Sequence, residues 1–375
     1  MATVPRVEEL RAHNMRYRID FALIVITGNL ARYLTIRPIV ERDPTVTSRW
    51  YPIRTWVADD PLRFLPDSFR VRMRHFLDSW RLYIRPSPDA IVIHAFETYY
   101  LYALLQRIFG RKTVIVNNPD AGFPISSRTL QRWLFKSAFS CTTLFIPWSN
   151  WAGACIREQY PQLTQDRLVV IHPGVDLTRW PLRPPTPPAE RFRILFVGGD
   201  LERKGADTLL DAFEQYLADS CELHLATQSG YLSSSMRERI ERLQHVVLHL
   251  DLNAGSEPLK QLYRESDVFV LPTNQDASSI VAIESMATGV PVIICPQGGI
   301  PDIVVDGETG LLIPPKDATA LARAVERLRA CAELREKIII QGRAHVEQYF
   351  DANKNTQQLL SVVKMLIDKR RNKRK

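Results

Sequence analysis

Two carboxylates with seven residues between them, Asp276 and Glu284, are the side chains of this sequence best suited to chemistry. Glu284 stands in a small and apolar run, residues 280–287, whose period and closing Gly289 predict a helix. A carboxylate in such surroundings needs a hydrogen-bond donor, because burying it unpaired costs several kcal/mol. That donor is either a fixed group of the protein or a hydroxyl of a bound ligand. The spacing therefore predicts a site for a ligand rich in hydroxyl groups.

The residues after this helix continue the pattern. An apolar strand, a glycine-rich loop and a turn follow, in the order Gly289-Val290-Pro291-Val292-Ile293, Gly298-Gly299-Ile300-Pro301-Asp302 and Asp306-Gly307-x-x-Gly310. Together with the two carboxylates, this ordered set resembles the donor half of the family 4 retaining glycosyltransferases. The resemblance extends over roughly residues 141–350. It implies the α/β fold called GT-B, in which two Rossmann-like, doubly wound domains face each other across a cleft.

The chain of 375 residues exceeds the size of one hydrophobic core, so two domains are expected. A proline-rich stretch, PLRPPTPP at 181–188, favours extended backbone and predicts the linker. We expect an acceptor-side domain over 1–183, a donor domain over 184–350, a helix returning to the first domain over 351–368, and a disordered basic tail over 369–375. The strands are expected at 17–26, 90–93, 113–116, 144–147, 168–171, 194–197, 222–226, 246–250, 267–271 and 290–294.

Charge is divided unevenly along the chain. Residues 1–188 carry 25 Lys and Arg against 15 Asp and Glu, a net charge of +10, whereas residues 189–368 carry 18 against 26, a net charge of −8. A basic half suits an anionic partner such as a membrane surface, a phosphorylated lipid or an acidic glycan. A solvated Arg-rich surface is the open alternative. No nucleic-acid-reading motif accompanies the charge, so nucleic acid is not an expected partner.

The rest of the composition favours a cytoplasmic protein. The five cysteines are scattered without metal-ligand spacing, as is typical of reduced thiols. No apolar run is long enough to span a bilayer, and the first residues are too charged for a secretory signal. Residues 66–85 place apolar side chains at helical spacing, with Arg70, Arg74 and Arg81 around them. This helix either lies on the inner face of a membrane or packs on the protein core.

A second group of candidates follows the expected strand at 194–197. The loop runs Gly198-Gly199-Asp200-Leu201-Glu202-Arg203-Lys204-Gly205 into a helix. Backbone N–H groups at the helix start, together with Lys204, would hold a diphosphate. The family usually has Arg at the position of Gly199, so one phosphate-binding cation is absent. Arg203 either substitutes for it or faces solvent.

The resemblance also assigns roles around the two carboxylates. It implies that Glu284 binds the ribose hydroxyls of the donor nucleotide and that Asp276 contacts the transferred sugar. The backbone N–H groups of Ser278, Ser279 and Ile280 would bind sugar hydroxyls or phosphate. The family usually has Glu at the position of Asp276, followed by a small residue, an aromatic residue and glycine, so the donor contact is altered here. A structural N-cap role for Asp276 is the competing interpretation.

In the first half, three residues end expected strands on the ligand-binding edge of the sheet. Gly28 lets the backbone approach a ligand, and the resemblance implies that its loop closes over the donor phosphates. His94 and Asp120 are candidates to orient or deprotonate the acceptor hydroxyl. Both are also explained by structural hydrogen bonding.

The sequence has no metal-ligand constellation, so no metal and no cofactor beyond the co-substrate is expected. The resemblance implies a hexosyltransferase that moves a sugar from a nucleotide diphosphate sugar to a hydroxyl of a glycan or lipid-linked glycan, with retention, and we expect it to be metal-independent. Two alternatives remain open. One is a nucleotide-sugar epimerase of the same fold, and the other is a non-catalytic nucleotide-sugar binding protein.

Overall fold

The computed structural model describes residues 17–24, 30–53, 67–94, 96–110, 113–120, 136, 138–184 and 190–373. The chain divides into two compact units. The first contains the described residues of Met1–Trp148, Gly153–Ile171 and Thr356–Lys375, and the second contains Ser149–Ala152 and His172–Asn355. Each unit is built around one parallel sheet, as the sequence predicts.

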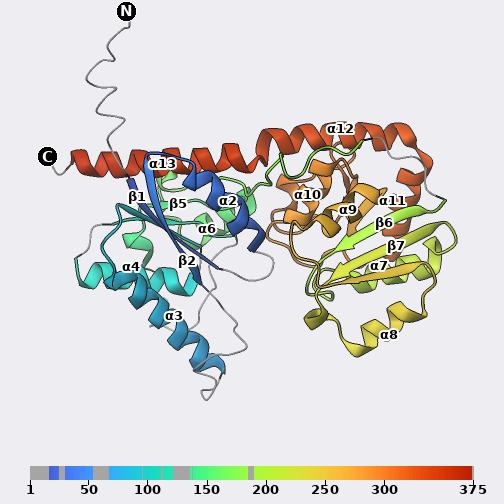
Figure 1. Ribbon diagram of the computed structural model, residues 1–375, viewed down its shortest axis with the longest axis horizontal. Coiled ribbons are helices and arrows are strands. Elements are labelled where there is room, and N and C mark those ends of the chain that lie inside the picture. The colour runs from blue at the N-terminus through green and yellow to red at the C-terminus, as the bar shows by residue number, and fades with distance from the viewer. Residues whose placement is uncertain are drawn as a thin grey trace, which may run out of the picture. The chain divides into compact units, whose positions relative to one another are not determined.

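The first unit holds a five-stranded sheet with the order β2-β1-β3-β4-β5 (Figure 1). Its strands are β1 (Tyr17–Ile24), β2 (Val46–Ile53), β3 (Ala90–Ile93), β4 (Val114–Asn117) and β5 (Leu144–Phe145). Its helices are α2 (Leu30–Glu41), α3 (Asp67–Ile84), α4 (Phe96–Ile108) and most of α6 (Asn150–Gln159), with the greater part of α13 (Ala352–Asn372). All strand pairs are parallel.

The inner strands β3 and β4 are buried along their whole length, which explains why they read as continuous apolar runs. Alternate residues of β3 enter different cores: Ala90 and Val92 pack with α2 and α13, whereas Ile91 and Ile93 pack with α3 and α4. Helix α13 contributes a row of apolar side chains to the first of these cores. They are Leu359, Leu360, Val363 and Ile367.

The second unit holds a six-stranded sheet with the order β11-β10-β9-β6-β7-β8. Its strands are β6 (Phe192–Val197), β7 (Cys221–Thr227), β8 (Val246–Leu250), β9 (Val268–Leu271), β10 (Val292–Ile294) and β11 (Leu311–Leu312). Its helices are α7 (Ala206–Ala212), α8 (Ser234–Arg242), α9 (Glu257–Glu265), α10 (Ile280–Thr288), α11 (Ala318–Ala330) and α12 (Ala332–Tyr349). Strands β6, β7 and β8 are added towards one edge of the sheet, and β9, β10 and β11 are then added from β6 towards the other edge. As a result α7 and α8 cover one face of the sheet, and α9 and α10 cover the other (Figure 1).

Three sequence expectations differ from the structure. Residues 168–171 form one parallel bridge, from Leu168 to Phe145, instead of a strand. The segment that follows β5 contains Pro147, which has no backbone N–H and so cannot extend the hydrogen-bond ladder.

The second difference concerns the boundary between the units. They divide between residues 171 and 172, before the proline-rich stretch, because Val175 already exchanges backbone hydrogen bonds with Phe350 and Ala352.

The third difference concerns the basic tail. Helix α13 continues to Asn372, so residues 369–372 are helical and not disordered. Arg371 forms an ion pair with Asp89 at 3.1 Å, and Lys364 forms one with Asp43 at 2.6 Å. Arg371 of the predicted tail therefore has an acidic partner in the first unit. Within the residues that the structure describes, no helix has the length and apolar character needed to cross a membrane.

A tight turn carries the chain from β6 into α7. Gly205 caps α7 in the left-handed conformation, with φ +76°, and a methyl group there would overlap the carbonyl oxygen of Pro272. Pro272 directly follows β9, the neighbour of β6. Glycine at this position therefore lets two loops at one edge of the sheet approach each other.

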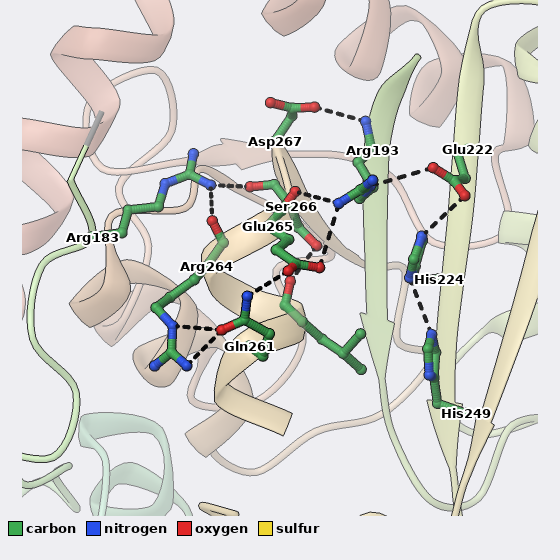
Figure 2. Close-up of polar contacts among 11 residues, drawn as sticks. Arg183, Arg193, Glu222, His224, His249, Gln261, Arg264, Glu265, Ser266 and Asp267 are labelled. Atoms are coloured by element: carbon green, nitrogen blue, oxygen red, sulfur yellow. Dashed lines mark hydrogen bonds and ion pairs between the residues drawn. The ribbon is translucent and has the colours of Figure 1, made fainter. Parts of the chain in front are cut away.

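A polar network also runs across β6, β7 and β8 (Figure 2). Arg193 pairs with Glu222 at 3.3 Å, and the other oxygen of Glu222 lies 3.4 Å from His224 Nε2. His224 Nδ1 and His249 Nε2 are 3.1 Å apart, so one of the two nitrogens donates to the other. Burial lowers the pKa of both histidines, and the proximity of His224 lowers that of His249 further. Burial therefore favours the uncharged form of both rings.

We expect Gly205→Ala to destabilise the protein by roughly 2–5 kcal/mol, since the left-handed backbone and the steric overlap both oppose it. Gly307→Ala is the matched control, because Gly307 has φ +70° and open space around its Cα. The control should cost only about 1–2 kcal/mol. Urea unfolding measures both, and equal losses would contradict the steric argument.

We also expect acid to weaken the protein through the histidine pair. The folded-state pKa lies below the unfolded value, so this contribution to stability is complete above about pH 6.5 and is lost as the pH falls through the folded-state pKa. His249→Gln keeps a donor but does not titrate, so its free energy of unfolding should fall less between pH 7 and 5. His345→Gln, outside the pair, serves as the control. Identical acid dependence of wild type and His249→Gln would disprove the contribution.

Candidate functional site

The edge of the second sheet where β6 and β9 end brings two of the predicted residues together. Lys204 follows β6 and Asp276 follows β9, and these strands are neighbours. Lys204 Nζ donates to Asp276 Oδ2 at 2.5 Å, with only 12% and 7% of the two side chains exposed. The sequence identifies both residues as candidates but not their pairing, because 72 positions separate them.

Backbone packing holds Asp276 in place. Gly298, with φ +57°, lies against the carbonyl of Asp276, and a methyl group at Gly298 would overlap that oxygen. Arg203 donates from Nη1 to the carbonyl of Gln275 at 2.9 Å and from Nε to Asp200 at 3.2 Å. Arg203 therefore links the loop after β6 to the loop that carries Asp276. Its side chain does not simply face solvent, which was one of the two interpretations of the sequence.

The space at Gly199, where the family usually has Arg, is filled by an aromatic ring. A methyl group at Gly199 would lie 3.1 Å from the ring of Tyr231. Tyr231 ends a short helical turn after β7, and sequence reasoning missed it because nothing local connects it to Gly199. A larger residue at this position would have to displace that ring.

Helix α10 begins directly after the Asp276 loop. Its N-cap is Ser279, so the interpretation of Asp276 as the N-cap is wrong. Ser279 is buried, and its hydroxyl has no hydrogen-bond partner among the described residues. The first N–H groups of α10, from Ile280 onward, have no partner within the helix. The helix start thus offers positive partial charge and unpaired donors close in sequence to Asp276 and Ser278.

Glu284 lies in the second turn of α10 and is 4% exposed. Tyr263 Oη lies 3.3 Å from Glu284 Oε2 and 3.2 Å from the carbonyl oxygen of Val281, so its single hydrogen is shared between these two acceptors. Burial raises the pKa of Glu284 to about 8, although Tyr263, Arg179 and Lys260 act in the opposite direction. The carboxyl group is therefore neutral at pH 7. The sequence left open whether the donor to Glu284 is a protein group or a ligand hydroxyl. The structure contains a protein donor, the phenol of Tyr263.

In the first unit, His94 follows β3 and is buried. Its Nδ1 lies 2.5 Å from the carbonyl oxygen of Asn118, which can only accept, so Nδ1 carries the hydrogen. The ring stacks on Trp148, with centroids 4.5 Å apart, and Trp148 Nε1 donates to Asn118 Oδ1 at 3.0 Å. Asn118 and Trp148 fix the ring and were missed by sequence reasoning.

The remaining candidates of the first half are less informative. Asp120 is half-buried and follows β4, on the same sheet edge as His94. Gly28 lies outside the described residues. The described ranges contain no group of three or more His, Cys, Asp or Glu side chains arranged to hold a metal ion.

Comparison with known proteins finds a family match within the second unit. Residues 191–330 match the family of glycosyl transferases of group 1. A candidate colanic acid biosynthesis glycosyltransferase, WcaL from Salmonella typhimurium strain LT2, is 28% identical over 258 residues, which are 65% of this chain and 63% of WcaL. The chain thus spans less than two thirds of that relative.

Solved structures match over nearly the whole chain. Sucrose-phosphate synthase from Thermosynechococcus elongatus has a TM-score of 0.73 at 22% identity, covering 94% of this chain and 100% of its own. HepE from Anabaena, solved in complex with UDP-glucose, has a TM-score of 0.69 at 17% identity, covering 93% and 100%. The chain therefore has the two-domain fold of the GT-B glycosyltransferases, and its second domain carries a segment similar to the glycosyl transferases of group 1.

Proposed function

We propose that this protein is a retaining glycosyltransferase that moves a sugar from a nucleotide diphosphate sugar to an acceptor hydroxyl. The observation that carries the proposal is the buried pair of Lys204 and Asp276, at the ligand-binding edge of a domain similar to the group 1 glycosyl transferases. A cation and a carboxylate at that edge suit the two ends of such a donor, its diphosphate and its sugar.

In this proposal the ammonium of Lys204 stabilises the negative charge that develops on the leaving diphosphate, together with the N-terminus of α10. Asp276 accepts hydrogen bonds from hydroxyls of the transferred sugar, and Glu284 accepts those of the ribose. The N–H groups of Ser278, Ser279 and Ile280 complete the donor contacts, and Arg203 keeps the two loops together. The reaction then proceeds without a metal ion.

On the acceptor side, His94 Nδ1 donates to the carbonyl of Asn118, so Nε2 is the ring nitrogen that we propose acts on the acceptor. That nitrogen can accept a proton from the acceptor hydroxyl, or orient it, with Asp120 on the same sheet edge. Because WcaL is named for colanic acid biosynthesis, we propose a glycan or lipid-linked glycan as the acceptor. Because HepE was solved with UDP-glucose, UDP-sugars are the first donors to test.

The described part of α3 also supports contact with a membrane. Phe76, Leu77, Trp80 and Ile84 lie exposed along the helix. The end of α4 adds the exposed Ile108 and Phe109, and Phe109 is linked to α3 by its ring contact with Tyr83 at 5.4 Å. Arg81 and Arg107 provide positive charge in the last turns of the same two helices. An apolar surface edged with arginines suits an anionic membrane, where a lipid-linked acceptor would be found.

The test of the enzymatic function is donor turnover. UDP-, GDP- and ADP-sugars are incubated with the protein in the presence of EDTA, and slow hydrolysis of one of them is followed without acceptor. We expect Lys204→Ala to reduce that turnover by about 100-fold or more, since it removes a charged group that acts on the leaving diphosphate. Lys316→Ala, on a loop far along the chain, is the control and should leave turnover unchanged.

Three outcomes would redirect the proposal. A donor that raises the melting temperature but stays intact would favour the non-catalytic binding protein. A free sugar or epimerised nucleotide sugar as the final product, even with glycan acceptors present, would favour the epimerase. Activity that disappears in EDTA and returns with magnesium would disprove metal independence.

The membrane contact predicts a separate result. Vesicles with anionic lipid should bind the protein more strongly than neutral vesicles, and salt should weaken the binding. Trp80→Glu combined with Ile84→Glu should reduce co-sedimentation by roughly tenfold, since it places charge in the apolar surface. Ile340→Glu, at an equally exposed position on α12, is the control. Equal binding to both kinds of vesicle would favour a soluble acceptor.

A further inference from the structure

Glu284 is held in a setting that favours its neutral form. Its helix packs on the hydrophobic core of the second unit, to which the neighbouring Ile283 and Ala287 belong. Among the described residues its hydrogen-bond donor is the phenol of Tyr263, which is itself fully buried. No ion pair joins Glu284 to a cation in the part of the chain that the structure describes. Removal from water without a paired cation disfavours a carboxylate.

We propose that nucleotide binding at this site releases the proton of Glu284, and that Tyr263 positions the carboxyl group for that change. The inference rests on the proposed function, in which Glu284 accepts hydrogen bonds from the ribose. A protonated carboxyl group keeps one hydrogen of its own, whereas a carboxylate can accept from two hydroxyls. Two ribose hydroxyls would therefore stabilise the charged form, and the proton would pass to solvent.

The charged groups around Glu284 support this exchange. Arg179 and Lys260 favour the carboxylate electrostatically without pairing with it, so part of the compensation for ionisation is already present. Strands β9 and β10 offer only apolar side chains. From α12, Arg343 donates to the carbonyl of Ala287, almost one turn beyond Glu284. The ribose hydroxyls of a bound nucleotide thus need to supply only the rest of the stabilisation that the Glu284 carboxylate requires.

Tyr263 is well held for a positioning role. Its ring makes an edge contact with Trp180 at 5.3 Å and a stacked contact with Phe269 at 6.0 Å. Its own pKa is raised well above the usual value by burial and by Glu284, so the phenol stays a donor. The C-terminal end of its helix, α9, is capped by Arg183, which donates to the carbonyls of Arg264 and Ser266 (Figure 2).

A ligand-free titration tests the protonation itself. The folded-state pKa of about 8 exceeds the unfolded value of 4.5, so the folded protein retains a proton that the unfolded chain releases. Stability from this group is complete below about pH 4.5 and is lost as the pH rises towards 8. Glu284→Gln, which mimics the neutral form, should lack this loss. The same stability change with pH in wild type and Glu284→Gln would overturn the proposal.

Calorimetry with UDP, GDP and ADP tests the coupling. In buffers of different ionisation enthalpy, the nucleotide that binds should release about one proton at pH 7, and its Kd should fall by up to tenfold per pH unit until about pH 8. Glu284→Gln should bind more weakly and without proton release. A Kd independent of pH, with no proton released by wild type, would disprove the coupling while leaving the proposed function intact.

Tyr263→Phe separates positioning from packing. Losing the phenol should weaken binding by roughly tenfold at pH 7 and move the rise in affinity to higher pH, because the hydrogen bond favours the carboxylate. Tyr216→Phe, which removes an exposed phenol from the same unit, should change neither. Equal weakening by Tyr263→Phe at every pH would show a packing role only. If none of the three nucleotides binds, the proposed function itself is wrong, whatever the ligand-free titration reports.

Discussion

The hydrogen-bonded pairing of β6 with β9 is the constraint on which the candidate donor site depends. These strands are far apart in sequence, yet Ile194 and Leu195 pair with Val268 and Phe269 in the centre of the second sheet. Parallel pairing sends both following loops to one edge. Gly205 allows the first loop to reach the end of β9, and Lys204 then meets Asp276. The sheet order thus creates the charge pair, and the glycines make the approach sterically possible.

The two carboxylates of the site are maintained in different ways. Asp276 is buried beside a cation, so its charge is compensated by direct pairing with Lys204. Glu284 is buried beside a neutral phenol, so the carboxyl group keeps its proton. The difference follows from position, because Asp276 lies in a loop at the sheet edge and Glu284 lies inside the helix packed on the core. Asp276 therefore has a cationic partner, whereas the charge of Glu284 is the one that we propose nucleotide binding induces.

The charge asymmetry of the sequence also has a structural counterpart. Helix α13 carries basic residues into the first unit, where Lys364 and Arg371 pair with Asp43 and Asp89. Its apolar residues fill the core beside β1 and β3. The first unit therefore depends on a segment from the far end of the chain, and part of the apparent basic tail stabilises the fold. The arginines on α3 and α4 lie beside exposed apolar residues instead, which is why a membrane surface is sought there.

The sequence by itself determined most of the elements and the candidate residues, although β2 and β11 were not among the expected strands. Strands buried on both faces need continuous apolar runs, so β3, β8 and most of the others were predicted within two or three residues. Helix α10 was predicted with its end at Gly289, because a left-handed cap favours glycine. Lys204, Asp276 and Glu284 stood out because their local surroundings, glycine-rich loops and an apolar helix, are unusual for charged residues.

Only the tertiary structure decided how these residues interact. Tyr263 lies in a polar stretch that reads as a surface helix, yet it is fully buried and donates to Glu284. The carbonyl of Asn118 fixes the tautomer of His94, and Trp148 stacks on the ring. The tail helix and the early division of the chain at residue 171 likewise depend on distant partners. Local periodicity records which face of an element is buried, but strand order and long-range contacts determine what each buried group meets, and through it which charge that group can carry.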